Sequence, residues 1–163
     1  MLVDSESEWR TPKADYVGGI VGQLSYGAKS VTLSNLKNIV SVTGKDYVGG
    51  LIGSIYGSCS EYADYILTVD SMTNSGVVNG AKYVAGLFGH CQMNNGRYNM
   101  YMKATNMVNR GHISGATEVG GLIGYFSSDG ASSLSVFTTL GNVYASEGTH
   151  NMTIANGTNI TLQ

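Results

Sequence analysis

The sequence predicts an all-β chain that folds as a right-handed parallel β-helix, or β-solenoid, with about four to five coils of three short strands each. The first observation is a repeated phrase, most complete in residues 44–53, whose four copies end 31, 36 and 35 residues apart at Gly22, Gly53, Gly89 and Gly124. The second is a run of alternating apolar and polar residues before the last three copies, which is typical of half-buried strands. The third is the absence of any long helical period, together with a single proline in the chain.

Spacing inside the repeat is constant. An asparagine lies 15 residues before the final glycine of the last three copies, and a second glycine follows that asparagine after six residues. Constant spacing indicates that each residue has a fixed place in a rigid coil, where a turn amide can hydrogen-bond to neighbouring coils. We therefore predict two structural ladders of stacked side chains, one of Asn38, Asn74 and Asn109 and one of Tyr16, Tyr47 and Tyr83.

Each repeat is expected to contribute three strands, which in the second repeat cover residues 31–36, 40–43 and 48–55, the last with glycines at its bends. One coil cannot bury its apolar side chains alone, so equivalent residues of neighbouring coils must stack into a shared core. One buried column is expected at Ile20, Leu51, Leu87 and Leu122, and a second at Leu24, Ile55, Cys91 and Phe126.

The length suits a single domain over residues 1–163. Residues 1–13 are expected to form an N-terminal cap or a degraded coil, with Trp9 over the open end of the core, because terminal units of stacked repeats are atypical. The repeats end near residues 22, 53, 89 and 124. Residues 139–163 lose the phrase, so we expect a degenerate last coil or a C-terminal cap there, or a parent protein that continues beyond Gln163.

Three stretches resemble the GLUG motif of bacterial surface and adhesin-like proteins: Val48-Gly49-Gly50-Leu51-Ile52-Gly53, Val119-Gly120-Gly121-Leu122-Ile123-Gly124 and Asn109-Arg110-Gly111-His112-Ile113-Ser114-Gly115. The resemblance extends over about residues 7–145 and departs from the pattern at Ser7, Ala85 and Glu118. It implies a β-helix exposed at the cell surface or outside the cell, and it carries no catalytic residue. Residues 1–13 do not resemble a signal peptide, so the export signal is expected to lie outside this sequence.

Composition argues against several classes of function. Only 12% of the residues are charged and the net charge is −2, which does not provide the basic face that nucleic acid requires. No apolar run is long enough to cross a membrane. Three histidines, His90, His112 and His150, occupy unrelated positions of the repeat, so neither a metal site nor another cofactor is expected.

All variation in repeat length falls in the joining segments 23–37, 54–73, 90–108 and 125–138, which have 15, 20, 19 and 14 residues. Such insertions project from one edge of a solenoid, and loops on a rigid scaffold often carry function. The hypothesis is a ligand-binding patch for a glycan or a cell-surface protein, although ordinary loop packing also explains these residues: Tyr56, Tyr62, Asp64, Arg97 and Tyr98. Cys91 falls in an apolar column and should be buried, and no disulfide with Cys59 is predicted.

The predicted function is that of a non-catalytic extracellular repeat module of a bacterial surface or secreted protein, which serves adhesion or ligand presentation and belongs to a longer parent protein. The alternative is a polysaccharide-acting β-helix enzyme or its carbohydrate-binding part. Asp15 and Asp46 share one position of the repeat and could form a carboxylate pair, but Lys82 and Thr117 continue that column. A structural spacer without a ligand is the third interpretation.

Overall fold

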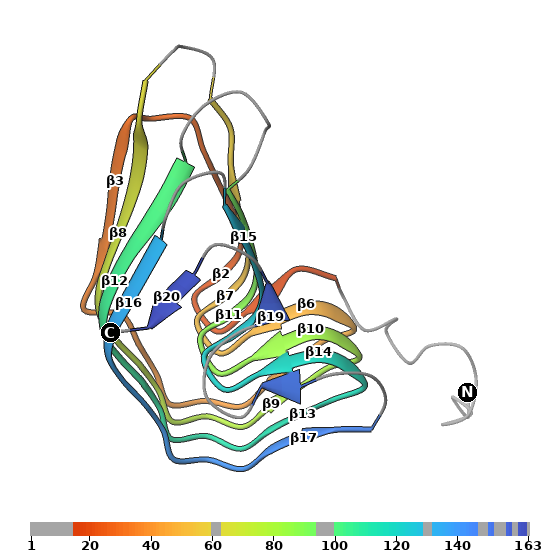
Figure 1. Cartoon of the computed structure of the whole chain (residues 1–163). Helices are drawn as coiled ribbons and strands as arrows, with labels where there is room; N and C mark the ends of the chain where they lie inside the picture. The colour runs from red at the N-terminus through yellow and green to blue at the C-terminus, as the bar shows by residue number, and fades with distance from the viewer. Residues whose placement is uncertain are drawn as a thin grey trace, which may run out of the picture.

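The structure is a computed structural model that describes residues 15–59, 63–93, 100–128, 132–146, 150–151, 156–157 and 160–162. Within these residues the chain is all-β, contains no helix, and pairs its strands in parallel (Figure 1). The predicted all-β class with parallel sheets is therefore confirmed. The expectations for Trp9 and for the rest of residues 1–13 lie outside the described residues.

The described strands form four parallel sheets, which we name A to D. Sheet A contains β1 (Val17–Gly18), β6 (Asp46–Gly49), β10 (Lys82–Ala85), β14 (Thr117–Gly120) and β18 (His150–Asn151). Sheet B contains β2 (Val21–Tyr26), β7 (Ile52–Gly57), β11 (Phe88–Met93), β15 (Ile123–Ser128) and β19 (Asn156–Gly157). Sheet C contains β3 (Ser30–Ser34), β8 (Tyr65–Asn74), β12 (Met100–Asn109), β16 (Ser132–Thr139) and β20 (Ile160–Leu162), with β4 (Lys37–Asn38) also paired to β8. Sheet D contains β5 (Val42–Thr43), β9 (Val78–Asn79), β13 (Ile113–Gly115) and β17 (Val143–Ala145).

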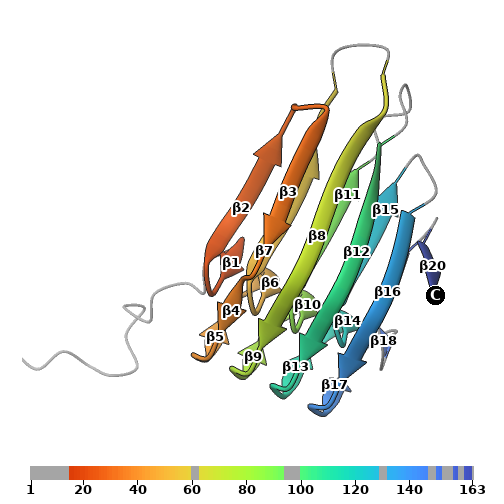
Figure 2. The ribbon, with the colours of Figure 1, turned by 90° about the vertical axis from the view of Figure 1, so that its left-hand side faces the viewer.

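Equivalent residues of successive repeats pair with one another. In sheet A, Val84 is the register partner of both Val48 and Val119. In sheet B, Cys91 pairs with both Ile55 and Phe126. Figure 2 shows the result, in which each strand lies beside the strand of the repeat before it and the repeat after it. The constant spacing of the phrase therefore predicted the register correctly.

The number of strands per repeat differs from the expectation. The predicted third strand at residues 48–55 is divided, because β6 ends at Gly49 and β7 begins at Ile52. At the bend between them, a Cβ atom on Gly50 would overlap the Gly86 carbonyl oxygen of the next repeat. Only glycine allows the two backbones to approach so closely. The repeats of β8–β11 and β12–β15 consequently have four strands, one in each sheet, and the repeat before them has five because β3 and β4 both belong to sheet C.

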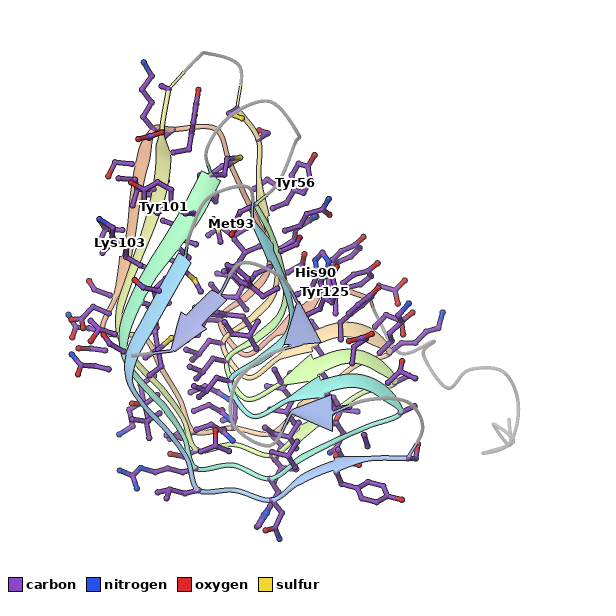
Figure 3. The ribbon with its side chains drawn as sticks, in the orientation of Figure 1. Tyr56, His90, Met93, Tyr101, Lys103 and Tyr125 are labelled. Atoms are coloured by element: carbon purple, nitrogen blue, oxygen red, sulfur yellow. The ribbon has the colours of Figure 1, made fainter. Side chains whose placement is uncertain are left out.

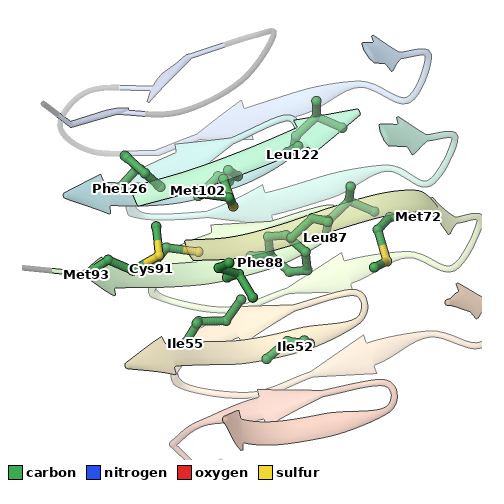
Figure 4. Packing of buried hydrophobic residues seen from close by; sticks show 14 of the residues in the cluster. Ile52, Ile55, Met72, Leu87, Phe88, Cys91, Met93, Met102, Leu122 and Phe126 are labelled. Atoms are coloured by element: carbon green, nitrogen blue, oxygen red, sulfur yellow. The ribbon is translucent and has the colours of Figure 1, made fainter. Parts of the chain in front are cut away.

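Most of the apolar core lies between sheets B and C. Leu51, Leu87 and Leu122 are fully buried, as the sequence predicted, and so are Ile55, Cys91 and Phe126 in the second column (Figure 4). The prediction was wrong for Ile20, which is 45% exposed, and Leu24 of the second column is only partly buried. Ile20 belongs to the first described repeat, so a described repeat packs against only one side of it. On that side, the Ile20 N–H donates a hydrogen bond to the Leu51 carbonyl oxygen. A smaller valine cluster joins sheets A and D, and its fully buried members are Val48, Val78, Val84 and Val119.

The predicted asparagine ladder is confirmed. Nδ2 of Asn38 donates to Oδ1 of Asn74 at 2.9 Å, and Nδ2 of Asn74 donates to Oδ1 of Asn109 at 3.0 Å. Each amide also closes a local turn, because it donates to the carbonyl oxygen two residues ahead and accepts a bond from the backbone N–H of that same residue. The ladder thus satisfies a row of buried polar groups that would otherwise destabilise the interior.

Candidate functional site

The proposed insertion patch is placed only in part by the structure. Tyr56 is on β7 with 40% of its side chain exposed, and Asp64 is exposed just before β8. Tyr62, Arg97 and Tyr98 lie outside the described residues. Much of the predicted insertions 54–73 and 90–108 is strand, because β7 continues to Gly57, β8 begins at Tyr65, β11 continues to Met93 and β12 begins at Met100. β7 pairs with β11 and β8 with β12, so the strand ends that flank the two insertions lie side by side. We call this end of sheets B and C the insertion edge.

The predicted tyrosine ladder is confirmed on the outer surface. The ring centroids of Tyr16 and Tyr47 are 4.6 Å apart with planes 7° from parallel, and those of Tyr47 and Tyr83 are 4.9 Å apart at 23°. Tyr16 is 41% exposed, and the other two are half-buried. The fourth repeat has Glu118 at this position. Stacking covers the ring faces between neighbours and leaves ring edges exposed.

An unusual backbone conformation turns these tyrosines outward. Their φ angles are 56°, 56° and 55°, in the left-handed region that residues with a side chain rarely adopt. As a result, side chains do not alternate between the two faces of the strand at this point. Asp46 and Tyr47 both face outward, and Val48 faces the interior. The Tyr47 carbonyl then lies against Gly53, where a Cβ atom would come within 2.5 Å of it. This contact explains the final glycine of the repeated phrase, since a larger residue would separate sheets A and B.

A second column of side chains, from sheet B, packs against the ladder. Its members in the four repeats are Gln23, Ser54, His90 and Tyr125. The His90 ring meets Tyr47 at 5.3 Å and Tyr83 at 5.0 Å in edge-to-face contacts, and it stacks on Tyr125 at 5.5 Å. Figure 3 places His90 and Tyr125 together on the side of sheet B that faces away from sheet C. We name the five rings the tyrosine–histidine face: Tyr16, Tyr47, Tyr83, His90 and Tyr125.

The face also carries polar groups of defined charge. Lys82 is exposed, with its Nζ atom 4.6 Å from the centroid of the Tyr83 ring. The pKa of Lys82 is raised, first by its hydrogen bond to Tyr83. Burial lowers the pKa of His90 to about 4, with a further contribution from Lys82, so this imidazole is neutral at pH 7. The pKa of Tyr47 is raised, first by partial burial and then by the neighbouring phenols of Tyr16 and Tyr83.

The carboxylate pair considered for catalysis, Asp15 and Asp46, is not followed by further carboxylates along the stack. Asp46 pairs in register with Lys82, and Lys82 pairs with Thr117. Asp46 forms an ion pair with the exposed Lys45 at 3.9 Å, and such a surface pair contributes little to stability. Within the described ranges, no group of three or more histidine, cysteine, aspartate or glutamate residues is arranged to hold a metal ion. The same part of the chain has no helix of the length and apolarity that a membrane crossing needs.

The cysteines follow the sequence interpretation. Cys91 is fully buried in the sheet B column, and its pKa is raised by burial. Cys59 is half-buried against the core, and no disulfide joins the two. The buried Tyr26 hydroxyl has a raised pKa, caused first by burial and then by the nearby Cys91 and Cys59 thiols. This cluster is part of the core beside the insertion edge.

Comparison with known proteins adds no relative to these observations. The chain matches no protein-family model, no curated protein and no solved structure. Sequence reasoning found the tyrosine ladder but interpreted it as structural only, and it missed His90 and Tyr125. The available signal was that His90 and Tyr125 follow the final glycines Gly89 and Gly124 by one residue each.

Proposed function

We propose that the chain is a right-handed β-solenoid and serves as a non-catalytic repeat module of a bacterial surface or secreted protein. One observation carries this proposal: successive repeats, 31 to 36 residues apart, pair in register, and from the second repeat onward they do so in all four sheets. Such a stack grows by adding layers and presents the same side-chain positions in a row along its outer surface. Repetition of one surface position is the feature that adhesive and ligand-presenting modules require.

The insertion edge is the proposed binding region for a glycan or a cell-surface protein. Tyr56 and Asp64 are exposed there, and the adjacent strand ends support the proposal of a single patch that also includes Tyr62, Arg97 and Tyr98. Tyrosine suits such a patch because it offers a large apolar surface with a polar tip. Further domains of a longer parent protein would position the module at the cell surface, as the GLUG resemblance implies.

The polysaccharide-acting enzyme is the less favoured proposal. A glycoside hydrolase needs two carboxyl groups about 5 to 9 Å apart across the bond that it cleaves. The column holds two carboxylates, Asp15 and Asp46, and continues with Lys82 and Thr117 on the described strands. Asp15 is exposed at the first described repeat, and Asp46 is half-buried beside Lys45. This pattern favours binding over hydrolysis.

The test is a binding screen of the intact chain against arrays of glycans and of extracellular proteins. In the variant, residues 60–64 and 94–99 are replaced by glycine and serine at unchanged length. The matched control carries Thr32→Ala and Ser34→Ala, two exposed positions on β3 away from the loops. We expect the variant to lose a ligand that the control retains, with the midpoint of urea unfolding unchanged. Release of reducing sugar from a bound polysaccharide would contradict the non-catalytic function.

A further inference from the structure

The tyrosine–histidine face is a second candidate binding surface. Its rings belong to the first four repeats and to two different sheets, and their contacts join them into one continuous patch. With a strand spacing of about 4.8 Å, four repeats extend this patch over about 14 Å along the stacking axis. Contiguous exposed aromatic surface on a protein is often functional.

The chemical character of the face restricts the ligand. Within the ladder, the ring faces of Tyr16, Tyr47 and Tyr83 cover one another, so a ligand meets ring edges and phenol hydroxyls. Each phenol hydroxyl can both donate and accept a hydrogen bond. The His90 imidazole is neutral and its Nδ1 lies 3.5 Å from Ser54 Oγ, so it offers a ligand one ring nitrogen, Nε2. Similar groups therefore recur at intervals of one strand spacing. A ligand that repeats hydroxyl groups along its own length complements this row.

The flanking charges are balanced. Lys45 and Lys82 are offset by Asp46 next to the ladder and by Glu118 in the fourth position of the ladder. A nucleic acid would need a net positive surface here, which the face does not have. A peptide strand would pair with the edge of a sheet. The tyrosine–histidine face lies instead on the flat side of sheets A and B, whose central strands already pair with neighbours on both sides.

We propose that the tyrosine–histidine face binds a neutral, extended polysaccharide that lies along the stacking axis. Phenol hydroxyls and the His90 imidazole hydrogen-bond to the sugar hydroxyls, and the ring edges contact the apolar C–H surface of the sugars. This inference rests on the proposed binding function, but it assigns the ligand class to a surface other than the insertion edge. Because the surface repeats with each layer, longer oligosaccharides bind more tightly until they span the four repeats.

The experiment measures binding of the intact chain to soluble glucomannan, mixed-linkage β-glucan and amylose by isothermal calorimetry, with polygalacturonate as an acidic probe. The test variant is Tyr47→Phe with Tyr83→Phe, which removes two hydroxyls and keeps both stacked rings. The matched control is Tyr144→Phe, at a 61% exposed tyrosine on β17 in sheet D. A third protein carries the glycine–serine insertion variant described above.

We expect at least one neutral polysaccharide to bind, and we expect the double phenylalanine variant to bind it about tenfold or more weakly. Each lost hydrogen bond is worth roughly two- to twelvefold in affinity. The control and the insertion variant should bind as the unmodified chain does, with all melting temperatures within a few degrees. Equal affinity of the double phenylalanine variant overturns the inference, as does binding of the acidic probe alone.

The two proposals fail separately. If the insertion variant loses polysaccharide binding while the double phenylalanine variant keeps it, the insertion edge is the site and the present inference is wrong. If the unmodified chain binds no neutral polysaccharide but binds an extracellular protein, the proposed binding function stands and this inference falls. If nothing binds from either array or from the polysaccharide panel, both proposals are overturned and the spacer interpretation replaces them.

Discussion

Replacing Asn74 with alanine tests how the interior of the stack is stabilised. Asn74 has no exposed surface, and its amide takes part in four hydrogen bonds. It donates to Gly76 O at 2.8 Å and to Asn109 Oδ1 at 3.0 Å, and it accepts from Gly76 N at 3.2 Å and from Asn38 Nδ2 at 2.9 Å. The substitution therefore removes these partners from groups that water cannot reach.

The expected cost follows from the groups left without partners. Gly76 is buried, and both its N–H and its carbonyl lose the bonds that the amide made. An unsatisfied buried polar group costs about 1–3 kcal/mol, so Asn74→Ala should cost about 3–5 kcal/mol. Asn38→Ala is the matched control, because that amide makes the same turn at Val40, a 57% exposed residue, where both hydrogen bonds are only partly buried. Water can replace the bonds at Val40, so the control should cost about 1–2 kcal/mol.

Urea denaturation, followed by circular dichroism, measures both free energies of unfolding. The comparison is valid where the dependence on urea concentration is the same for all three proteins. A typical domain has about 5–15 kcal/mol of stability, so Asn74→Ala should leave a clearly weakened but measurable fold. Equal costs for the two substitutions, or a cost below about 1 kcal/mol for Asn74→Ala, would refute the reasoning from burial.

Three further predictions concern the core, one histidine and the cysteines. Leu87→Ala, at a fully buried position, should lower the free energy of unfolding by about 2–5 kcal/mol, and an unchanged urea midpoint would contradict the core assignment. The folded pKa of His90, about 4, lies below its ordinary value of 6.5, so the unfolded state binds the proton more readily between these values. Stability should therefore fall as the pH is lowered from about 6.5 to about 4, and His90→Gln should show a shallower fall in melting temperature; identical slopes would exclude this contribution. A thiol reagent should label Cys59 in the native protein and Cys91 only after unfolding, because burial removes access to Cys91 and raises its pKa. Equal labelling of both cysteines in the native protein would contradict the buried position of Cys91.

The register could be predicted from sequence because parallel stacking pairs identical positions. Once the phrase had a constant length, the partners of Ile55 could only be Leu24 and Cys91, and the structure pairs them so. The same logic gave the asparagine and tyrosine ladders. This prediction depends only on the number of residues between repeated positions. It therefore holds whichever role is assigned to the side chains at those positions.

Local backbone geometry could not be predicted in the same way. A strand reading of residues 48–55 assumes uninterrupted extension, and the close approach of Gly50 to the next repeat appears only when the layers are assembled. The left-handed conformation of Tyr47 likewise breaks the two-residue alternation on which strand prediction relies. The sheet B column of the candidate site was missed because its members differ in chemistry. Gln23 and Ser54 occupy the same position as His90 and Tyr125, but they do not indicate aromatic contacts with the ladder.

The direction of the stack has a mechanical consequence. Along sheet A the strands follow in chain order from β1 to β18, so the layer interfaces are in series and each one carries the whole of a force that pulls the two ends of the stack apart. Hydrogen bonds between layers then break in sequence from an end, and they do not share the load across the whole stack. Each layer of 31 to 36 residues would release about 100–120 Å of extended chain when it detaches. Under tension, the stack would behave as an extensible tether that lengthens in regular steps and dissipates work with each step.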